Sequence, residues 1–395
     1  MKQIGILILV LFSYSAFAQT ELQTIKKANE LIADKKYETA FTLLDKFDPD
    51  NIKPDIVLLK QEILLEYFVT SMMHQAFSLK DIDKSEDILD YRGKDGLSDV
   101  HLFQADSILQ GLIKRYPANC NLYKALGEYY YEVHLKYGGR WLKEDVELFP
   151  WIETNFKKAV DGNCADFMTY YSLGYINLLQ EKTAESIPWF LKSIALNQEH
   201  ASSHYNLAYA YLFTDDRANA LTHAKAALEL YKGDEYKSDA AQMVGQIYTE
   251  LGEDINALTY HEKAFEIDPG NYNNNRTLLG LYVKQNHKKA GQMTRQFFDQ
   301  APDNPTIYHD LEAIYLDNKK DKDLIAFYNS QLPLYKQNEK VLGGLNFYLA
   351  QLYIQLDKKV AKEYFIKARS HFEKVFGNDH EVFAVIAQGL EQCEK

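Results

Sequence analysis

The chain has 395 residues, of which 46% are hydrophobic and 25% are charged. This balance is typical of a globular protein and excludes a largely disordered chain. Lysine and arginine total 44 against 56 aspartate and glutamate residues, which gives a net charge of -12. Such a charge repels phosphates and anionic lipids at long range, so the composition disfavours binding to nucleic acid or to a lipid surface.

Residues 1–18 have the pattern of a secretory signal peptide. Lys2 precedes an almost unbroken apolar run over residues 4–12, and Ala16-Phe17-Ala18 is the small-x-small pattern that a signal peptidase cleaves. We therefore expect an exported protein, periplasmic or secreted. Since residue 19 is Gln rather than Cys, we do not expect a lipoprotein. The alternative, an uncleaved anchor, is disfavoured because the apolar run is short for a membrane span, and no later segment is expected to cross a membrane.

A period of 34 residues runs through the middle of the chain. Leu173-Gly174 recurs 34 residues later as Leu207-Ala208, and the pattern can be followed through seven units. Three residues after the aligned position of each unit, tyrosine occurs in six of the seven units, at Tyr130, Tyr211, Tyr248, Tyr282, Tyr315 and Tyr353, while the remaining unit has Asn177. Small residues such as Ala220 and Ala227 mark the second half of the unit. A period of this length is typical of a solenoid of paired helices.

This arrangement resembles the tetratricopeptide repeat. In that family a large residue, Leu, a small residue and Tyr mark the first helix of each pair (helix A), while Ala, an aromatic residue and Ala mark the second (helix B). The resemblance implies an all-α fold, a right-handed superhelical solenoid of antiparallel helix pairs with roughly eight or nine units, some of them degenerate. Small residues at these positions let the backbones of two helices approach closely.

The match to the repeat is uneven along the chain. We expect an N-terminal helical segment with one degenerate repeat over residues 19–85, well-matched units over 86–270, and degenerate units with C-terminal capping helices over 271–395. Within the first segment, residues 54–79 are predicted to form one long apolar helix.

One unit is longer than the others. Gly127 and Gly174 are 47 residues apart, thirteen more than the period, which places an insertion near residues 137–151. It contains Arg140, Trp141 and Trp151. We interpret it either as a recognition loop for a partner or as a loop that covers apolar helix surface.

The resemblance also implies which side chains face the inner, concave surface. Mapped by the period, the helix A residues are Tyr171, Tyr175, Tyr205, Tyr209, Gln242 and Gln246. Tyrosine is favoured at interfaces because it offers flat apolar area, a hydroxyl group and few rotamers to lose. The glutamines can hydrogen-bond to an extended peptide. The alternative is that these tyrosines pack between repeats.

Asn206 occupies a position at which some family members hold a terminal carboxylate. Tyr171 and Tyr205 stand where such a clamp needs lysine, and Glu128 would repel an acid, so we do not expect this ligand. Asn206 remains a candidate contact for a partner.

The three cysteines leave a question open. Cys120 and Cys164 fall in loops between repeats on one edge of the predicted solenoid, and either a disulfide or two free buried thiols is compatible with the sequence. Cys393 is expected to be unpaired.

No catalytic motif is present in the sequence. It lacks a Gly-rich phosphate loop, a His-Glu-x-x-His helix and a Gly-x-Ser-x-Gly turn, so we predict no enzyme, no cofactor and no metal site. We predict a non-catalytic scaffold that binds a peptide or a partner protein. The alternative is a glycan- or nutrient-binding protein of the cell envelope that stacks sugars on Trp and Tyr.

Overall fold

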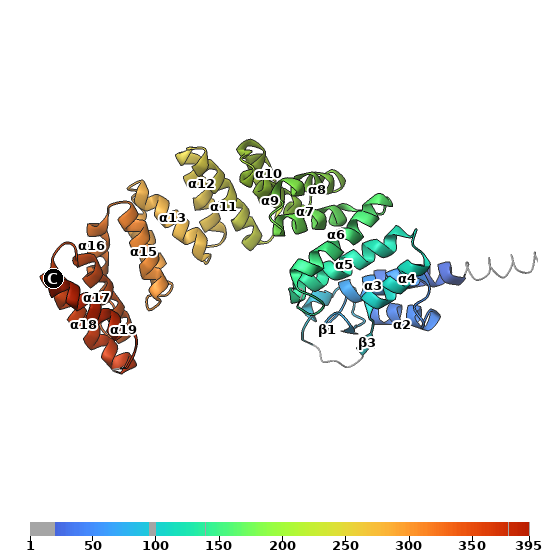
Figure 1. Ribbon diagram of the computed structural model, residues 1–395, viewed down its shortest axis with the longest axis horizontal. Coiled ribbons are helices and arrows are strands. Elements are labelled where there is room, and N and C mark those ends of the chain that lie inside the picture. Colours follow the sequence, from blue (N-terminus) through green and yellow to red (C-terminus); the bar gives the residue numbers. More distant parts are fainter. Residues whose placement is uncertain (1–19, 95–99, 139, 378, 395) are drawn as a thin grey trace, which may run out of the picture. The chain divides into compact units, whose positions relative to one another are not determined.

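The computed structural model describes residues 20–94, 100–138, 140–377 and 379–394, so the predicted signal peptide lies outside it. The chain forms two compact units, Met1–Asp216 (unit 1) and Arg217–Lys395 (unit 2). Both consist mainly of helices, and most helices pack against their neighbours in sequence (Figure 1). The fold is an all-α solenoid. The domain boundaries expected from the sequence stay a prediction.

Unit 1 begins with a helix over residues 20–33. The helices that follow are α2 (Tyr37–Phe47), α3 (Pro54–Glu66), α4 (Ala105–Arg115), α5 (Cys120–Tyr137), α6 (Asp145–Asp161), α7 (Phe167–Leu179), α8 (Thr183–Leu196) and α9 (Ala201–Phe213). Helices α3, α5, α7 and α9 contact one another in this order. They are the A helices of successive pairs, and we call the side chains on their shared side the helix A surface.

Unit 2 contains ten described helices, and they continue the pairing. They are α10 (Arg217–Leu230), α11 (Asp234–Glu250), α12 (Asp254–Ile267), α13 (Tyr272–Lys284), α14 (Ala290–Asp299), α15 (Pro305–Asp317), α16 (Asp321–Gln331), α17 (Glu339–Tyr353), α18 (Lys358–Phe376) and α19 (Val382–Glu394). Across the described residues of both units, no helix is sufficiently long and apolar to cross a membrane.

The single helix predicted over residues 54–79 is wrong. Helix α3 ends at Glu66, and the chain then forms β1 (Thr70–Met72) and β2 (Ala76–Ser78), which pair antiparallel; β3 (Val100–Leu102) pairs with β2. Met73 and His74 at the turn have positive φ angles, which a helix does not allow. Aromatic and β-branched residues after Glu66 favour strands, so their apolarity reflects a buried sheet face.

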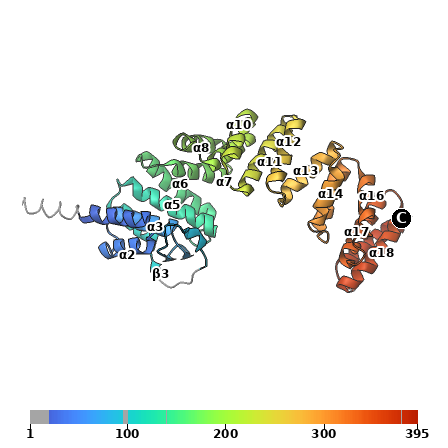
Figure 2. The ribbon, with the colours of Figure 1, turned by 180° about the vertical axis from the view of Figure 1, so that it is seen from behind.

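The small sheet lies beside α2 and α3, as Figures 1 and 2 both show. A short 3-10 helix (Ile88–Asp90) stands between β2 and β3 in the chain. The ring of Phe41 on α2 contacts His101 on β3 at 4.6 Å between centroids. Phe77 on β2 is buried in the same core as α3 and α5. The sheet is therefore part of the hydrophobic core of unit 1.

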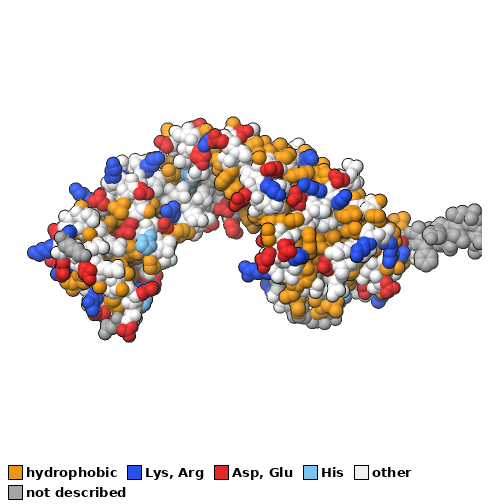
Figure 3. Space-filling model, viewed as in Figure 1, with side chains coloured by type: hydrophobic (Ala, Val, Ile, Leu, Met, Phe, Trp, Pro, Cys, Tyr) orange, Lys and Arg blue, Asp and Glu red, His pale blue; other side chains and the backbone are white. Residues whose placement is uncertain are grey.

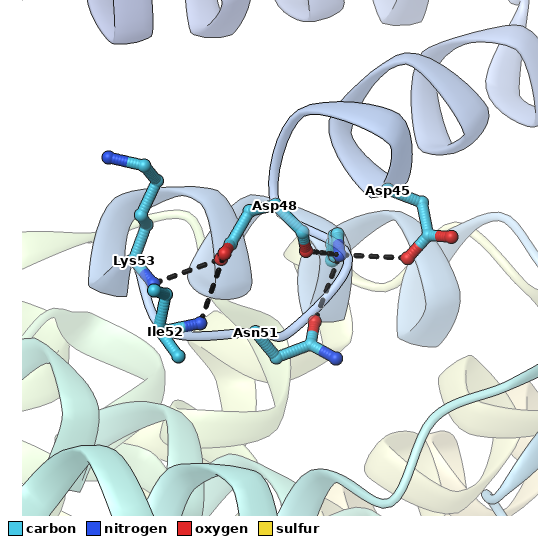
Figure 4. A network of polar contacts seen from close by, with 6 residues as sticks. Asp45, Asp48, Asn51, Ile52 and Lys53 are labelled. Atoms are coloured by element: carbon cyan, nitrogen blue, oxygen red, sulfur yellow. Dashed lines mark hydrogen bonds and ion pairs between the residues drawn. The ribbon is translucent and has the colours of Figure 1, made fainter. Parts of the chain in front are cut away.

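A buried lysine joins α2 to α3. Lys60 is fully buried on α3, and its Nζ donates to Asp45 Oδ1 at 2.9 Å, to the Asp48 carbonyl at 2.7 Å and to Asn51 Oδ1 at 2.9 Å. The Asp48 carboxylate accepts from the backbone N–H groups of the two residues before α3 (Figure 4). Because a buried ammonium group needs acceptors, this network specifies the shape of the turn.

Glycines on A helices make room for large side chains on B helices. A Cβ at Gly174 would lie 2.7 Å from the ring of Phe190, and one at Gly245 would lie 2.8 Å from the ring of His261. The repeat between them has alanine at both positions, 208 and 224. In the α7–α8 and α11–α12 pairs, a glycine on the A helix and a large ring on the B helix thus fill the space between the two helices.

The thirteen extra residues are spread over a helix pair. Helices α5 and α6 have 18 and 17 residues, against 13 and 14 for α7 and α8, and their connection is longer as well. The sulfur atoms of Cys120, at the start of α5, and Cys164, after α6, form a disulfide with 5.8 Å between the Cα atoms. This bridge joins the first residue of α5 to the connection that follows α6. Cys393 is free.

Candidate peptide-binding surface

The four tyrosines predicted on the helix A surface all lie in unit 1. Tyr171 and Tyr175 stand one turn apart on α7, and their rings are stacked with 6.1 Å between centroids. Asn206 on α9 donates from Nδ2 to the Tyr171 hydroxyl at 3.2 Å, so this amide links the two helices. The structure thus brings Asn206 and the α7 tyrosines together.

Of the four tyrosines, Tyr209 on α9 is the most accessible. Tyr205 is half-buried, and Tyr209 is 39% exposed. The ring of Tyr209 lies 4.4 Å from that of Phe213, which is 65% exposed. Two aromatic rings in contact at the surface of one helix form an apolar platform that a partner can cover.

Tyr171 and Tyr175 also pack within the protein. The ring of Tyr171 contacts His200 at 4.9 Å and Phe190 at 6.0 Å, and Tyr175 meets Tyr131 of α5 edge-on at 6.2 Å. One face of each ring therefore belongs to the packing between repeats. This is the packing between repeats that the alternative interpretation expects, and contact with a partner stays a prediction.

Gln242 and Gln246 lie on α11, in unit 2. Gln242 is half-buried, whereas Gln246 is exposed and lines a cavity of about 330 Å³ with residues of α12, α13 and α15. Arg276 and the buried His261 line the same cavity. Gln246 therefore belongs to a cavity of unit 2, and Gln242 does not line it.

The aromatic residues of the insertion lie against α5. Trp141 is half-buried and meets Tyr129 edge-on at 6.4 Å. Trp151, at the surface of α6, lies 5.2 Å from the ring of Tyr130, and the Lys143 ammonium group stands 5.3 Å from its centroid. Arg140 is exposed. Trp141 thus covers buried side chains, and Trp151 keeps one side toward solvent.

A cavity that the sequence interpretation missed lies in unit 1. It has a volume of about 720 Å³ and is lined by the helix over residues 20–33 and by α3, α5 and α7. Six carboxylates line it, from Asp55, Glu62, Glu66, Glu128, Glu132 and Asp166. Among the described lining residues, Lys124 is the one basic side chain. We call this the acidic cavity. It differs from the face in Figure 3, on which acidic and basic side chains are interspersed.

Lys124 compensates only part of this charge. Its Nζ lies 2.5 Å from Asp166 Oδ2 and 3.4 Å from Glu128 Oε1. Asp166 also caps α7 by accepting from the Thr169 N–H at 2.8 Å. Burial opposes the charge of Lys124, but these two carboxylates outweigh it and raise its pKa. Asp166 is thus engaged structurally, while the glutamates of α3 and α5 remain in excess.

The glutamates are crowded into the cavity wall. Burial raises the pKa of Glu128 well above its usual range, although Lys124 works in the opposite direction. Burial raises the pKa values of Glu62 and Glu132 as well, and Glu66 adds to both shifts. Like charges held close together disfavour ionisation, so the cavity favours any group that brings positive charge.

A buried amide completes the wall. Gln61 is 3% exposed and lines the acidic cavity. Its Nε2 donates to the Ala125 carbonyl at 2.8 Å, and its Oε1 has no hydrogen-bond partner. A buried acceptor without a donor costs free energy, which a ligand donor would recover.

The repeat contained a signal for this cavity. Lys124 and Glu128 stand three residues before and one residue after Gly127, as Tyr171 and Tyr175 do around Gly174. The period therefore maps the first pair to the helix A surface too. Glutamates four residues apart on α3 and on α5 share one helix face. Gln61 has no such signal, because its unpaired oxygen depends on packing.

No cluster of three or more His, Cys, Asp or Glu side chains in the described ranges is arranged to hold a metal ion. His200 and His204, four residues apart, bond instead within the protein. The ring of His200 contacts Ser203 Oγ at 2.7 Å, and that of His204 contacts the Gln198 carbonyl at 3.1 Å.

Comparison with solved structures finds other helical repeat proteins. A tetratricopeptide repeat protein from Parabacteroides merdae is 18% identical, with 69% of this chain and 99% of that chain aligned and a TM-score of 0.42. The C-terminal part of a repeat protein from Cytophaga hutchinsonii is 13% identical over 72% of this chain and 92% of that one, with a TM-score of 0.42. YrrB, a repeat protein with an unusual peptide-binding site, is 18% identical over 42% and 76%, with a TM-score of 0.35.

No curated protein matches the chain significantly. The family model of the tetratricopeptide repeat matches three consecutive segments, residues 169–200, 201–234 and 238–271. They coincide with the pairs α7 and α8, α9 and α10, and α11 and α12. The family match agrees with the helix boundaries and with the close contacts at Gly174 and Gly245, since all three indicate paired helices over this part of the chain. The chain therefore contains three consecutive tetratricopeptide repeats, over residues 169–271.

Proposed function

We propose that the protein is a non-catalytic scaffold that binds a peptide or a segment of a partner protein on the helix A surface of unit 1. The observation that carries the proposal is the row of tyrosines on α7 and α9, with Tyr209 and Phe213 exposed side by side. Tetratricopeptide repeats are typical of proteins that bind other proteins. Rigid aromatic side chains on a helical framework bind with little loss of side-chain entropy.

Site-specific photocrosslinking tests this proposal. A benzophenone amino acid placed at position 209 in the mature protein should form adducts with a partner from the cell envelope. The same probe at position 191, an exposed leucine on the B helix α8, serves as the control. Tyr175→Ser/Tyr209→Ser should reduce capture of that partner by at least about tenfold, as expected for interface anchors. Equal adducts at both positions, or capture unaffected by the tyrosine changes, would contradict the proposal.

We also propose that the protein works outside the cytoplasm. The cleavage pattern at residues 16–18 and the disulfide between Cys120 and Cys164 support this location, because disulfides persist in oxidising compartments. Cell fractionation followed by N-terminal sequencing tests it. A chain that begins at Gln19 in the periplasm or the medium is the expected result, and a cytoplasmic chain that retains residue 2 is the contradicting one.

A further inference from the structure

We infer that the acidic cavity of unit 1 receives a lysine or arginine side chain from the segment that the protein binds. The inference rests on the proposed function and specifies the chemistry of the partner. Glu62 and Glu66 on α3 face the same cavity as Glu128 and Glu132 on α5. Lys124 alone opposes them among the described lining residues, and it is shared with Asp166.

A cationic group bound in the cavity would reduce the electrostatic repulsion between these glutamates. An ammonium or guanidinium group between α3 and α5 would favour the ionised form of Glu62, Glu128 and Glu132 and donate charge-assisted hydrogen bonds to them. Lys124, Lys136 and Arg92 are the cations that already act on these carboxyl groups. Their attraction does not offset burial, since the pKa of each of the three glutamates remains raised.

Gln61 supplies an independent indication of a ligand. Its Oε1 is a buried acceptor without a donor at the cavity wall. Lysine and arginine side chains carry only donors at their tips, so they can satisfy this oxygen and the carboxylates together. An anionic or purely apolar ligand would leave it unpaired.

The walls of the cavity fit a side chain with an apolar stem. Leu22, Ile25 and Leu65 line it together with the carboxylates. Aliphatic stems of lysine and arginine bury against such surfaces while the charged tip reaches polar groups. Tyr131 lines the cavity and contacts Tyr175, so the cavity is continuous with the tyrosine row. One extended segment can therefore contact both.

A matched set of peptides tests the inference with the whole mature protein. The peptides share an extended background of alanine, serine and two tyrosines, have blocked ends and carry Lys, Arg, Gln or Glu at one central position. We expect the Lys and Arg peptides to bind at least tenfold more tightly than the Gln and Glu peptides in fluorescence anisotropy. The preference should shrink with added salt. It should also shrink between pH 7 and pH 5, because burial raises the pKa of Glu128 to about 7 and this carboxyl group becomes protonated over that range.

Variants then locate the effect. Glu128→Gln/Glu132→Gln should weaken the Lys peptide at least tenfold and leave the Gln peptide unchanged. Gln61→Met should weaken the Lys peptide several-fold. The matched control is Glu147→Gln/Glu153→Gln on α6, which changes the net charge equally outside the cavity. Helical circular dichroism should be retained, and Glu66→Gln provides a single exposed change in the cavity wall if the double variant does not fold.

Several results would overturn the inference. The first is that the Lys and Gln peptides bind equally, and the second is that the Lys and Arg peptides do not bind. The third is that the α6 control variant changes binding as much as the cavity variant does. The fourth is that free spermidine binds more tightly than the Lys peptide. If charge has no effect while Tyr175→Ser/Tyr209→Ser abolishes binding, the inference fails and the proposed function stands. Loss of crosslinking at position 209 contradicts the proposed function separately.

Discussion

The cavities of the two units occupy similar positions in the repeat but differ in chemistry. In unit 1, Lys124 and Glu128 flank Gly127 and line a cavity with six carboxylates. In unit 2, Arg276 and Gly280 flank Leu279 in the same way and line a cavity with Gln246, His261 and Lys284. The repeat thus determines which positions line a cavity, while the residues at these positions determine its charge.

The two units also differ in their internal cross-links and buried polar side chains. Unit 1 has a disulfide and the buried Lys60, whereas unit 2 buries His261 with both ring nitrogens unpaired. All three tryptophans of the chain lie in unit 1, at positions 141, 151 and 189. Tryptophan fluorescence therefore reports on unit 1, and unit 2 can be followed by a probe attached to Cys393.

Loss of the disulfide should have the largest effect on the difference in stability between the two units. Cys120→Ser/Cys164→Ser should lower the free energy of unfolding of unit 1 by about 4 kcal/mol, because the bridge closes a loop of 44 residues in the unfolded chain. Urea unfolding followed by tryptophan fluorescence measures this, and Cys393→Ser is the control. Counting thiols in the denatured, unreduced mature protein should find one. Three thiols would show that the bridge does not form.

Removal of a large side chain between paired helices should have a similar effect. Phe190→Ala should destabilise unit 1 by about 3 to 4 kcal/mol, because it leaves a cavity beside Gly174. Gly174→Ala in the normal protein should cost about 1 to 3 kcal/mol through overpacking. Adding it to Phe190→Ala should recover stability, since alanine occupies both positions in the next repeat. Additive losses in the double variant would contradict this account of the packing.

The buried histidine of unit 2 should make that unit sensitive to acid. Burial lowers the pKa of His261 to about 4 from 6.5, so the unfolded chain binds this proton more readily. Its neutral form stabilises the fold above pH 6.5, and this contribution is lost as the pH falls toward 4. The loss is on the order of 3 kcal/mol.

His261→Phe, which copies the residue at position 190, should remove this dependence. The stability difference between the variant and the normal protein, measured by urea unfolding with the Cys393 probe, should grow from pH 7 to pH 4. Burial raises the pKa of Glu312, so this residue makes stability depend on pH in the opposite direction. Because Glu312 is present in both proteins, its contribution cancels in the stability difference between the variant and the normal protein. A constant difference would show that His261 does not titrate in this way.

The lysine network should contribute less. Lys60→Met should destabilise unit 1 by about 2 kcal/mol, because it removes the donor to the Asp48 carbonyl and Asn51. Asp45 is half-exposed and can be solvated, which limits the loss. Lys157→Met, at an exposed pair with Glu153, is the matched control and should change stability by less than about 1 kcal/mol. Equal effects of the two changes would mean that the network does not stabilise the turn.

The period of the sequence allowed much of the fold to be predicted. The helix pairs over residues 167–267 follow from small residues and tyrosines at fixed spacing, because each repeat makes the same contacts with its neighbours. The error at residues 54–79 shows the limit of this reasoning. An apolar run is compatible with a helix or a strand, and only the positive φ angles at Met73 and His74 and the pairing of β2 with β3 decide between them.

The sequence by itself determined that helices pair at a 34-residue interval and that tyrosines lie on the A helices, since both depend on local spacing. The tertiary structure decided the rest. In the tertiary structure Cys120 is bonded to Cys164 and Trp141 contacts Tyr129. Glutamates from α3 and α5 line one cavity with Gln61, whose Oε1 has no hydrogen-bond partner. These features depend on distances between residues far apart in the chain, which packing determines and local pattern does not.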